Sequence, residues 1–299
     1  MKVEELKHLF SPGKIGSLYV KNRIMMAPLG SRLTTENGAV TDDMIEFYSQ
    51  RARGGAGIIC IEAMGIDYPL AVGNANHVRF HDSCYMPGHA KLAERIHECG
   101  AKAFALLWHA GINKGAFMGE TPVAPSAILN PNTGIVPRAL PAEEIHGLVD
   151  KFGQAAHRAM LCGYDGVSVH ASHGYLISSF VSAATNQRTD EYGGSFENRI
   201  RFALEVLEAI KKNTRKDYPV IFRINGSDFI ENGITEEEAA AFAQALEAGG
   251  VDAIDVSAGV YGTIVTMIEP IQYPEGWKLY LPENIKKAVH VPVFGVGVI

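Results

Sequence analysis

The stretch that decides the fold is residues 220–257, VIFRINGSDFIENGITEEEAAAFAQALEAGGVDAIDVS. It begins with the apolar run Val220–Ile224 and ends with a second run, Ala253–Ser257. Continuous apolar runs, in place of a period-two alternation, are typical of strands buried on both faces of a parallel sheet. Between the runs, Thr235 followed by Glu238 is a capping box, which predicts the start of a helix. The stretch therefore predicts one β-α-β unit.

The same unit recurs along the chain. Short apolar runs predict further strands at Ile24–Ala27, Gly57–Ile61, Ala103–Leu107, Gly166–Val169 and Val293–Val296. Amphipathic stretches that end at glycine predict helices from Thr41 to Arg53, over Met86–Cys99, over Ala142–Cys162, and from Thr235 to Gly249-Gly250. Strict β-α alternation leaves two main solutions, an open doubly wound sheet or a closed barrel. Because no GxGxxG follows the first strand, we favour an α/β fold of the (β/α)8 TIM barrel type.

The predicted strands are one fewer than a closed barrel needs. We expect one domain over 1–299 and a barrel that is truncated after strand 7, with its eighth strand in a longer chain. The alternative is that the N-terminal segment Leu9–Lys21, predicted as a hairpin around Pro12-Gly13, covers the gap. An apolar edge strand left uncovered is a liability that proteins avoid.

Composition narrows the class of protein. Hydrophobic residues make up 47% and charged residues 20% of the 299, which is the balance of a globular enzyme. With 27 basic and 33 acidic residues the net charge is −6, and no basic cluster predicts a nucleic-acid or membrane partner. The chain has neither the roughly 20 apolar residues of a membrane span nor a recognisable signal peptide, so we expect a cytoplasmic protein. Buried thiols in a reducing compartment are predicted for the widely spaced cysteines, Cys60, Cys84, Cys99 and Cys162.

Reactive groups of a TIM barrel gather where its strands end. The predicted fourth strand ends in His170, His173 and Tyr175. The two imidazoles could bind a metal, but a pair with this spacing after a strand lacks the geometry to converge on one ion, and we predict no metal. Alternatively the imidazoles hold a carbonyl oxygen while the tyrosine transfers a proton. A third interpretation is a set of polar side chains satisfied at the barrel rim.

Arg223 lies in an apolar strand and must therefore find an anion inside the barrel mouth. A structural explanation is a pair with Asp255 on the next strand. The functional explanation is a cofactor that becomes anionic on reduction. Glycines near Val296 and Gly297 would let backbone N–H groups approach a phosphate, a type of site that recurs after the late strands of this fold.

Residues 167–202, VSVHASHGYLISSFVSAATNQRTDEYGGSFENRIRF, closely resemble the signature of the Old Yellow Enzyme family. This family of flavin-dependent ene-reductases includes 2,4-dienoyl-CoA reductase and bacterial NADH:flavin oxidoreductases. Similar segments extend over essentially the whole chain: LFSPGKIGSLYVKNRIMMAPLGS at 9–31, LLWHAG at 106–111, FRIN at 222–225 and PVFGVG at 292–297.

The resemblance implies FMN at the barrel mouth and NADH or NADPH as electron donor. Hydride passes through the flavin to the C=C bond of an α,β-unsaturated carbonyl compound or an enoyl- or dienoyl-CoA. His170 and His173 match the pair that binds the substrate carbonyl, and Tyr175 matches the proton donor. The residues that match flavin contacts are Ala27, Pro28, Leu29, Gly30, Ala63, Arg223, Val296 and Gly297.

The chain also departs from the family pattern. Leu106 replaces a glutamine that contacts the flavin, and Val298 stands where a basic or polar residue is frequent. The segment 163–202 and the long loop between Gly111 and Pro141 look closer to the multidomain branch than to the yeast-type enzymes. This resemblance implies a [4Fe-4S] cluster and FAD only if the native chain continues beyond residue 299. Alternatives are a flavin-dependent amine dehydrogenase, which an aromatic bowl would favour, or a truncated barrel without flavin that acts as a non-catalytic module. A small unsaturated molecule is the expected partner, and a homo-oligomer is left open.

Overall fold

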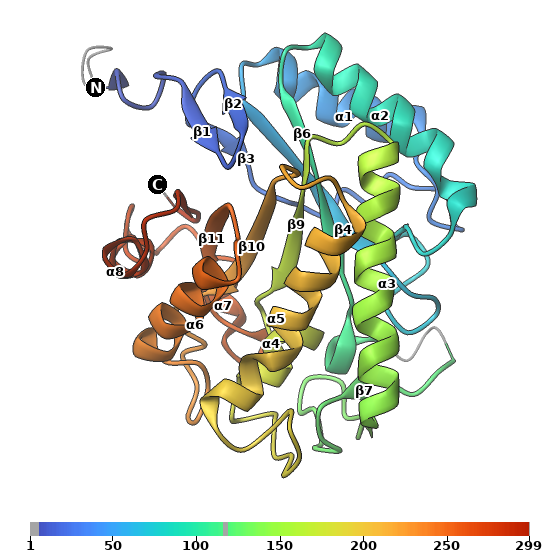
Figure 1. Ribbon diagram of the computed structural model, residues 1–299, viewed down its shortest axis with the longest axis vertical. Helices are drawn as coiled ribbons and strands as arrows, with labels where there is room; N and C mark the ends of the chain where they lie inside the picture. The colour runs from blue at the N-terminus through green and yellow to red at the C-terminus, as the bar shows by residue number, and fades with distance from the viewer. Residues whose placement is uncertain (1–5, 116–118, 299) are drawn as a thin grey trace.

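The computed structural model describes residues 6–115 and 119–298, so both ends of the predicted domain 1–299 lie outside the described ranges. A curled parallel sheet forms its centre, and helices pack on the outer face of that sheet (Figure 1). In the described residues the strands of this wall are β3 (Met25–Met26), β4 (Ile58–Gly65), β6 (Lys102–Trp108), β9 (Gly166–Ala171), β10 (Val220–Asn225), β11 (Ala253–Ser257) and β12 (Val293–Gly295). Each pairs in parallel with the next in chain order, which confirms the predicted barrel wall of seven strands.

The outer helices follow the strands in strict alternation. They are α1 (Asp42–Arg53), α2 (Met86–Glu98), α3 (Ala142–Leu161), α5 (Phe196–Asn213), α6 (Glu236–Ala248) and α8 (Tyr280–Ala288). Shorter elements lie in the loops: β5 (Val78–Arg79), η2 (Ser83–Tyr85), η3 (Gly111–Asn113), β7 (Val123–Ala124), β8 (Arg138–Ala139), α4 (Leu176–Val181), η5 (Tyr261–Thr263) and α7 (Ile264–Met267).

The predicted N-cap threonines are confirmed, whereas the predicted capping box is wrong in its second half. Thr41 and Thr235 accept hydrogen bonds at their side chains from the third residue on, Met44 and Glu238, as N-caps do. The capping box at Thr235 is incomplete, because the Glu238 carboxylate pairs with Arg199 of α5. A buried guanidinium therefore takes the carboxylate that the sequence pattern assigns to the helix end.

The N-terminal hairpin has a different turn from the predicted one. Strands β1 (Gly13–Ile15) and β2 (Leu18–Val20) pair with Ile15 opposite Leu18, so the turn is at Gly16-Ser17 and not at Pro12-Gly13. Gly16 has φ +52, which only glycine adopts without strain.

Side chains of the hairpin fill the floor of the barrel instead of completing its wall. Ile15 and Val20 pack with Ile58, Phe104 and Ile221 inside the ring of strands. A cavity of about 470 Å³ lies between the hairpin and the β12 edge, so the gap between β12 and β3 is not covered by the hairpin. The hairpin and α8 lie on the same side of the molecule, near the two labelled chain ends (Figure 1).

Alternation along each strand sends one set of side chains to the helices and the other into the barrel. On β9, Val167 and Val169 belong to the core under the helices, while Ser168 and His170 are buried on the other face. Towards the end of the strands the inner set changes from apolar to polar. The inner residues at this end are His170, Arg223, Asn225, Asp255 and Ser257, all buried.

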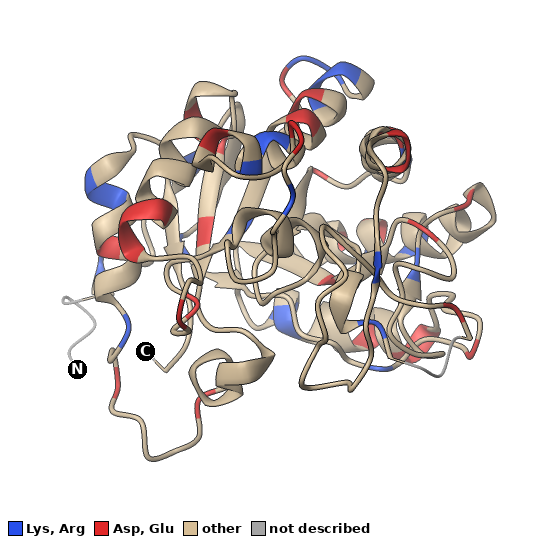
Figure 2. Cartoon of the chain, turned by 90° about the horizontal axis from the view of Figure 1, so that it is seen from below, with Lys and Arg blue, Asp and Glu red and all other residues tan. Residues whose placement is uncertain are grey.

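Acidic and basic residues are interspersed over the helices and loops (Figure 2). In the described part of the chain, no helix combines the length and the apolar character that crossing a membrane requires.

Candidate active site

His170, His173 and Tyr175 come together where β9 ends. His170 is the inward residue of the strand, and Tyr175 immediately precedes α4. The ring centroid of His170 lies 5.2 Å from that of His173 and 4.8 Å from that of Tyr175. In the ranges that the structure describes, no three His, Cys, Asp or Glu side chains gather as metal ligands; the expectation of a metal-free site stays a prediction.

His173 has a strained backbone with φ +61, which a residue other than glycine seldom adopts. The side chain of Asn225 holds it, because its Oδ1 accepts a hydrogen bond from the His173 backbone N at 3.2 Å. Asn225 Nδ2 donates to Asp228 Oδ1 at 2.6 Å and to the Gly259 carbonyl at 3.0 Å. One buried carboxamide thus connects the ends of β9, β10 and β11.

Burial decides the protonation states of this cluster. It lowers the pKa of His170 well below the usual range, and the charge of Arg223 adds to this effect. Burial likewise lowers the pKa of His173, whose Nε2 lies 2.8 Å from Ser257 Oγ. Burial and the neighbouring Tyr261 raise the pKa of Tyr175. At neutral pH the imidazoles are therefore neutral, and the phenol carries its proton.

Tyr175 has a hydrogen-bond partner from another strand end. Its hydroxyl oxygen lies 3.0 Å from that of Tyr261, the first residue of η5. From its place after β11, the sequence offers Tyr261 as an alternative to Tyr175 as proton donor, and the fold brings the two hydroxyl groups together.

Arg223 is 6% exposed and lies level with His170 on β9 and Asp255 on β11. Its Nη1 pairs with Asp255, and its Nη2 lies 3.3 Å from Ser257 Oγ. The pair that the sequence offers as a structural explanation is therefore formed. A guanidinium has further N–H donors, so this pair leaves Arg223 able to bind a second acceptor.

The loop Ala27–Gly30 follows β3 at the same end of the barrel, and Leu29 is 60% exposed there. Glu62 of β4 holds this loop, because its Oε2 accepts from the Ser31 backbone N at 2.6 Å. The same Oε2 accepts from the Tyr48 hydroxyl at 2.9 Å. A hydrogen bond to the buried Glu62 carboxylate therefore holds the end of this loop.

The second strand continues beyond its predicted end at Ile61 and includes Glu62 and Ala63. They lie within β4, whose pairing with β6 shifts register between Ile61 and Ala63. This irregularity, which a sequence pattern does not reveal, extends the strand and places Ala63 beside Leu106. Leu106 itself is 2% exposed and packs in the apolar floor with Phe104.

Val296 and Gly297 follow β12 at the rim. Gly297 has φ +129, and a Cβ there would lie 2.5 Å from Lys278 Cε. Lys278 is 4% exposed and pairs with Glu269. The predicted phosphate-binding backbone thus lies against a buried cation that the sequence does not single out, because residue 278 is in the long segment between β11 and α8.

Trp108, the last residue of β6, joins this cluster through its ring. Its centroid is 5.2 Å from that of Tyr175 and 4.9 Å from that of His77, with the rings edge to face. The Trp108 Nε1 is buried, and no partner for it occurs among the described residues. His77 belongs to the loop between β4 and α2, where no sequence pattern marks it.

These residues fit an isoalloxazine ring. The described part of the barrel mouth holds several hydrogen-bond donors: Arg223, the neutral His170 and His173, and the unsatisfied Trp108 N–H. Such a set complements the oxygen and nitrogen edge of a flavin that gains negative charge on reduction. The exposed loop Ala27–Gly30 offers backbone groups beside it.

Comparison with known proteins agrees with this geometry. The model of the NADH:flavin oxidoreductase / NADH oxidase family matches residues 8–299. An NADH oxidase of Thermoanaerobacter brockii is 45% identical over 98% of this chain and 45% of its own length. A cinnamate reductase of Clostridium sporogenes is 35% identical over 98% of this chain and 48% of its own. The chain spans about half the length of these relatives.

Solved structures share the fold. A 2-naphthoyl-CoA reductase in complex with 2-naphthoyl-CoA superposes with a TM-score of 0.91 at 33% identity, over 97% of this chain and 46% of that one. An old yellow enzyme homologue from Zymomonas mobilis gives a TM-score of 0.84 at 31% identity, over 96% of this chain and 81% of that one. The chain therefore belongs to the NADH:flavin oxidoreductase / NADH oxidase family, a family of flavin- and nicotinamide-dependent oxidoreductases.

Proposed function

We propose that this chain is the catalytic barrel of an FMN-dependent ene-reductase that uses NADH or NADPH and reduces the C=C bond of an α,β-unsaturated carbonyl compound. The observation that carries the proposal is the joint placement of His170, His173 and Tyr175 at the end of β9, beside the buried Arg223. Two neutral imidazole donors and a protonated phenol are the groups this reduction needs from the protein.

Each side chain has a distinct task. His170 and His173 donate hydrogen bonds to the carbonyl oxygen and so polarise the C=C bond towards hydride addition. Tyr175 delivers a proton to the α-carbon, and Tyr261 orients its hydroxyl. Arg223 would lie at the pyrimidine edge of FMN, with Ala27–Gly30 and Ala63 under the ring and Val296 and Gly297 at the phosphate. FMN, if held by these residues, would supply the hydride transfer from the nicotinamide to the β-carbon.

The amine dehydrogenase alternative needs a site that attracts a cation. Aromatic rings do gather here, in Trp108, Tyr175 and Tyr261. The cations Arg223 and Lys278 pair with Asp255 and Glu269. Their charges still act on the cluster, because both contribute to lowering the pKa of His173, and Arg32 acts in the same direction on the pKa of Tyr175. Coulomb repulsion from these groups disfavours an ammonium substrate and favours a carbonyl oxygen that becomes negative.

A further part of the proposal concerns the whole protein. Because the relatives are about twice as long as this chain, a [4Fe-4S] cluster and FAD would belong to additional domains, if the native protein has them. The small unsaturated substrate could be a free acid derivative or a CoA thioester.

The test is an anaerobic stopped-flow experiment on the intact protein. We expect a yellow protein whose oxidised flavin band is bleached by NADH or NADPH and restored by an enone, with the saturated product formed in equal amount. His170→Ala/His173→Ala should keep the flavin but lose the long-wavelength charge-transfer band that a bound phenol produces. A colourless protein would support the non-catalytic module, and bleaching by an amine without nicotinamide would support the amine dehydrogenase.

A further inference from the structure

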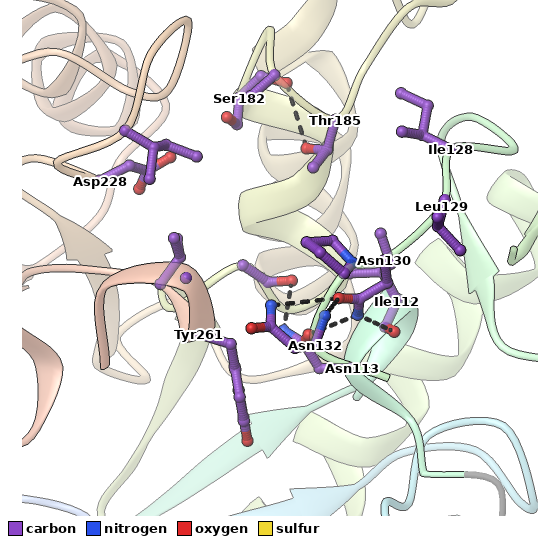
Figure 3. Close-up of a pocket in the computed structure, with 16 residues that line it drawn as sticks. Ile112, Asn113, Ile128, Leu129, Asn130, Asn132, Ser182, Thr185, Asp228 and Tyr261 are labelled. Atoms are coloured by element: carbon purple, nitrogen blue, oxygen red, sulfur yellow. Dashed lines mark hydrogen bonds between the residues drawn. The ribbon is translucent and has the colours of Figure 1, made fainter. Parts of the chain in front are cut away.

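A second cavity of about 320 Å³ opens beside His170, His173 and Tyr175, which we call the reactive cluster (Figure 3). It is enclosed by loops that follow β6, β9, β10 and β11, so it lies at the same end of the barrel as Tyr175. Apolar side chains dominate its rim and walls, among them Ile112, Leu129, Ile230 and Val260. Leu129 is 56% exposed and Ile230 is 38% exposed. Exposed apolar side chains around a concave surface are typical of ligand sites.

The amide side chains in this cavity are already engaged with the protein. Asn130 Nδ2 donates to the Ile112 carbonyl at 2.9 Å and to Asn113 Oδ1 at 3.1 Å, and its Oδ1 accepts from Asn132. Asn113 Nδ2 donates to the Gly174 carbonyl at 3.0 Å. These bonds are drawn in Figure 3. The amides therefore shape the wall and offer few free donors or acceptors to a ligand.

Among the described residues, the lining of the cavity contains no positive counter-charge. None of its 16 lining residues is Lys or Arg. Its carboxylate, Asp228, is fully buried, and burial raises the pKa of that group above its usual value. Asp228 accepts from Asn225 Nδ2 at 2.6 Å and from the Ile234 backbone N at 3.0 Å. In the described lining, an anionic ligand group would therefore have no cation to pair with. Its neighbour would be the Asp228 carboxyl group, which is either negative or neutral.

The cavity borders directly on the reactive cluster. Gly174 lines it and lies between His173 and Tyr175 in the chain, and Tyr261 lines it while its hydroxyl contacts that of Tyr175. His170, His173 and Tyr175 do not line the cavity themselves, so Gly174 and Tyr261 form the boundary between the two. A substituent of a molecule held at Tyr175 would have to pass Tyr261 to enter the cavity.

We infer that this cavity is a specificity pocket for an uncharged, apolar substituent of the substrate, such as an aryl or alkyl group. The inference rests on the proposed ene-reductase function and narrows its substrate class. Unsaturated carbonyl compounds with an apolar substituent on the double bond are preferred over those with a second carboxylate.

Three methyl esters that differ in one substituent test the inference: methyl cinnamate, methyl crotonate and monomethyl fumarate carry phenyl, methyl and carboxylate. The intact protein should reduce methyl cinnamate with a kcat/KM at least about 10-fold above that for monomethyl fumarate, the size expected of pocket contacts. Ala184→Phe fills the pocket and should lower kcat/KM for methyl cinnamate by roughly 10-fold or more. The same variant should change kcat/KM for methyl crotonate by less than about threefold, since a methyl group barely enters the pocket.

A charge variant and a binding measurement test the specificity pocket separately from the ene-reductase function. Ile230→Arg places a cation at the rim and should shift the ratio towards monomethyl fumarate by roughly 10-fold. Leu161→Arg, on an exposed residue at the end of α3 and at the opposite end of the strands, is the matched control and should not shift it. Ligand-observed NMR of methyl cinnamate reports binding without turnover.

Suppose that the wild-type protein binds methyl cinnamate, that Ala184→Phe abolishes this binding, and that no ester is reduced. This result would support the pocket and overturn the ene-reductase proposal. Equal effects of Ala184→Phe on all three esters, or wild-type preference for monomethyl fumarate, would overturn the pocket.

Discussion

The imidazole of His173 is held in place by a strained backbone conformation of the same residue. A left-handed conformation costs a residue of this type about 1–3 kcal/mol, so its surroundings must impose it. Asn225 does so through the hydrogen bond from the His173 N–H and two bonds to Asp228 and Gly259. The reactive geometry therefore depends on an amide that itself needs no contact with substrate.

Replacing that amide should show its positioning role. Asn225→Ala leaves buried polar groups unpaired and should lower the free energy of unfolding by about 1–3 kcal/mol. It should also slow reoxidation of the flavin by an enone more than flavin reduction by nicotinamide, because the proposed mechanism assigns His173 to the carbonyl oxygen of the enone. Urea denaturation and stopped-flow kinetics measure the two effects. Asn213→Ala, which removes an exposed amide, is the control. Unchanged stability together with unchanged reoxidation would show that His173 does not depend on Asn225.

Tyr175 is the residue whose loss should separate the two half-reactions. Tyr175→Phe removes the proposed proton donor and should slow substrate reduction by roughly 10²- to 10⁴-fold, the range for a positioned general acid. Flavin reduction by nicotinamide should persist. Tyr261→Phe, which removes only the partner hydroxyl, should have a smaller effect. Equal losses in both half-reactions of Tyr175→Phe would remove Tyr175 from the assigned role.

At the residue scale the sequence identifies side chains that lie near their own strand. His170, His173, Tyr175 and Arg223 could be predicted because strand ends meet at one end of a barrel. His77 and Lys278 could not, because they reach the same place from long loops whose course no periodicity fixes. The conformation of His173 was equally hidden, since a φ of +61 is imposed by contacts distant in sequence.

At the scale of elements, the loop after β3 depends on helix α1. Tyr48 of α1 donates to Glu62, and Glu62 accepts from Ser31, so helix, strand and loop share one carboxylate. The Tyr48 hydroxyl in turn accepts from the Glu62 backbone N at 3.0 Å. A change in the helix should therefore loosen a loop that belongs to the proposed flavin site.

Tyr48→Phe tests this connection. It leaves Glu62 with an unmet buried acceptor and should speed hydrogen exchange at the Ser31 amide and weaken FMN binding. The expected loss of unfolding free energy is about 1–3 kcal/mol. Exchange mass spectrometry over residues 27–33 and flavin titration give the two measurements. Tyr19→Phe, on the exposed hairpin, should change neither. Normal exchange at Ser31 in Tyr48→Phe would show that the loop holds itself.

Element boundaries followed the sequence where local chemistry fixes them. The glycines after α1, α2, α3 and α6 mark the helix ends as predicted, and Thr41 and Thr235 mark two starts. The hairpin turn and the length of β4 were wrong. A turn at Gly16 and a shift of register at Ala63 are settled by pairing with other strands, which the local pattern does not contain.

At the scale of the whole molecule, buried histidines should govern acid stability. Burial lowers the pKa of His89 to about 3, and of His77 and His109 to about 4, from 6.5. Between pH 6.5 and about 4 the unfolded chain binds protons that the folded protein does not. The free energy of unfolding should therefore be highest above pH 6.5 and fall on acidification, by up to about 1.4 kcal/mol per pH unit for each histidine.

Urea denaturation at several pH values between 5 and 7 measures that slope. His89→Gln removes one of the histidines whose pKa burial lowers, and it should make the slope smaller, whatever it does to stability at pH 7. His8→Gln, on an exposed residue, should leave the slope unchanged. A stability that does not vary between pH 5 and 7 would refute the assignment.

The first and the last strand of the described sheet each carry part of the proposed flavin site. The loop 27–30 follows β3, and Gly297 follows β12. A ligand that contacts both segments would tie together the two parts of the chain that are farthest apart in sequence. Its binding free energy would therefore add directly to the free energy of unfolding, so that ligand affinity could be read from a melting temperature.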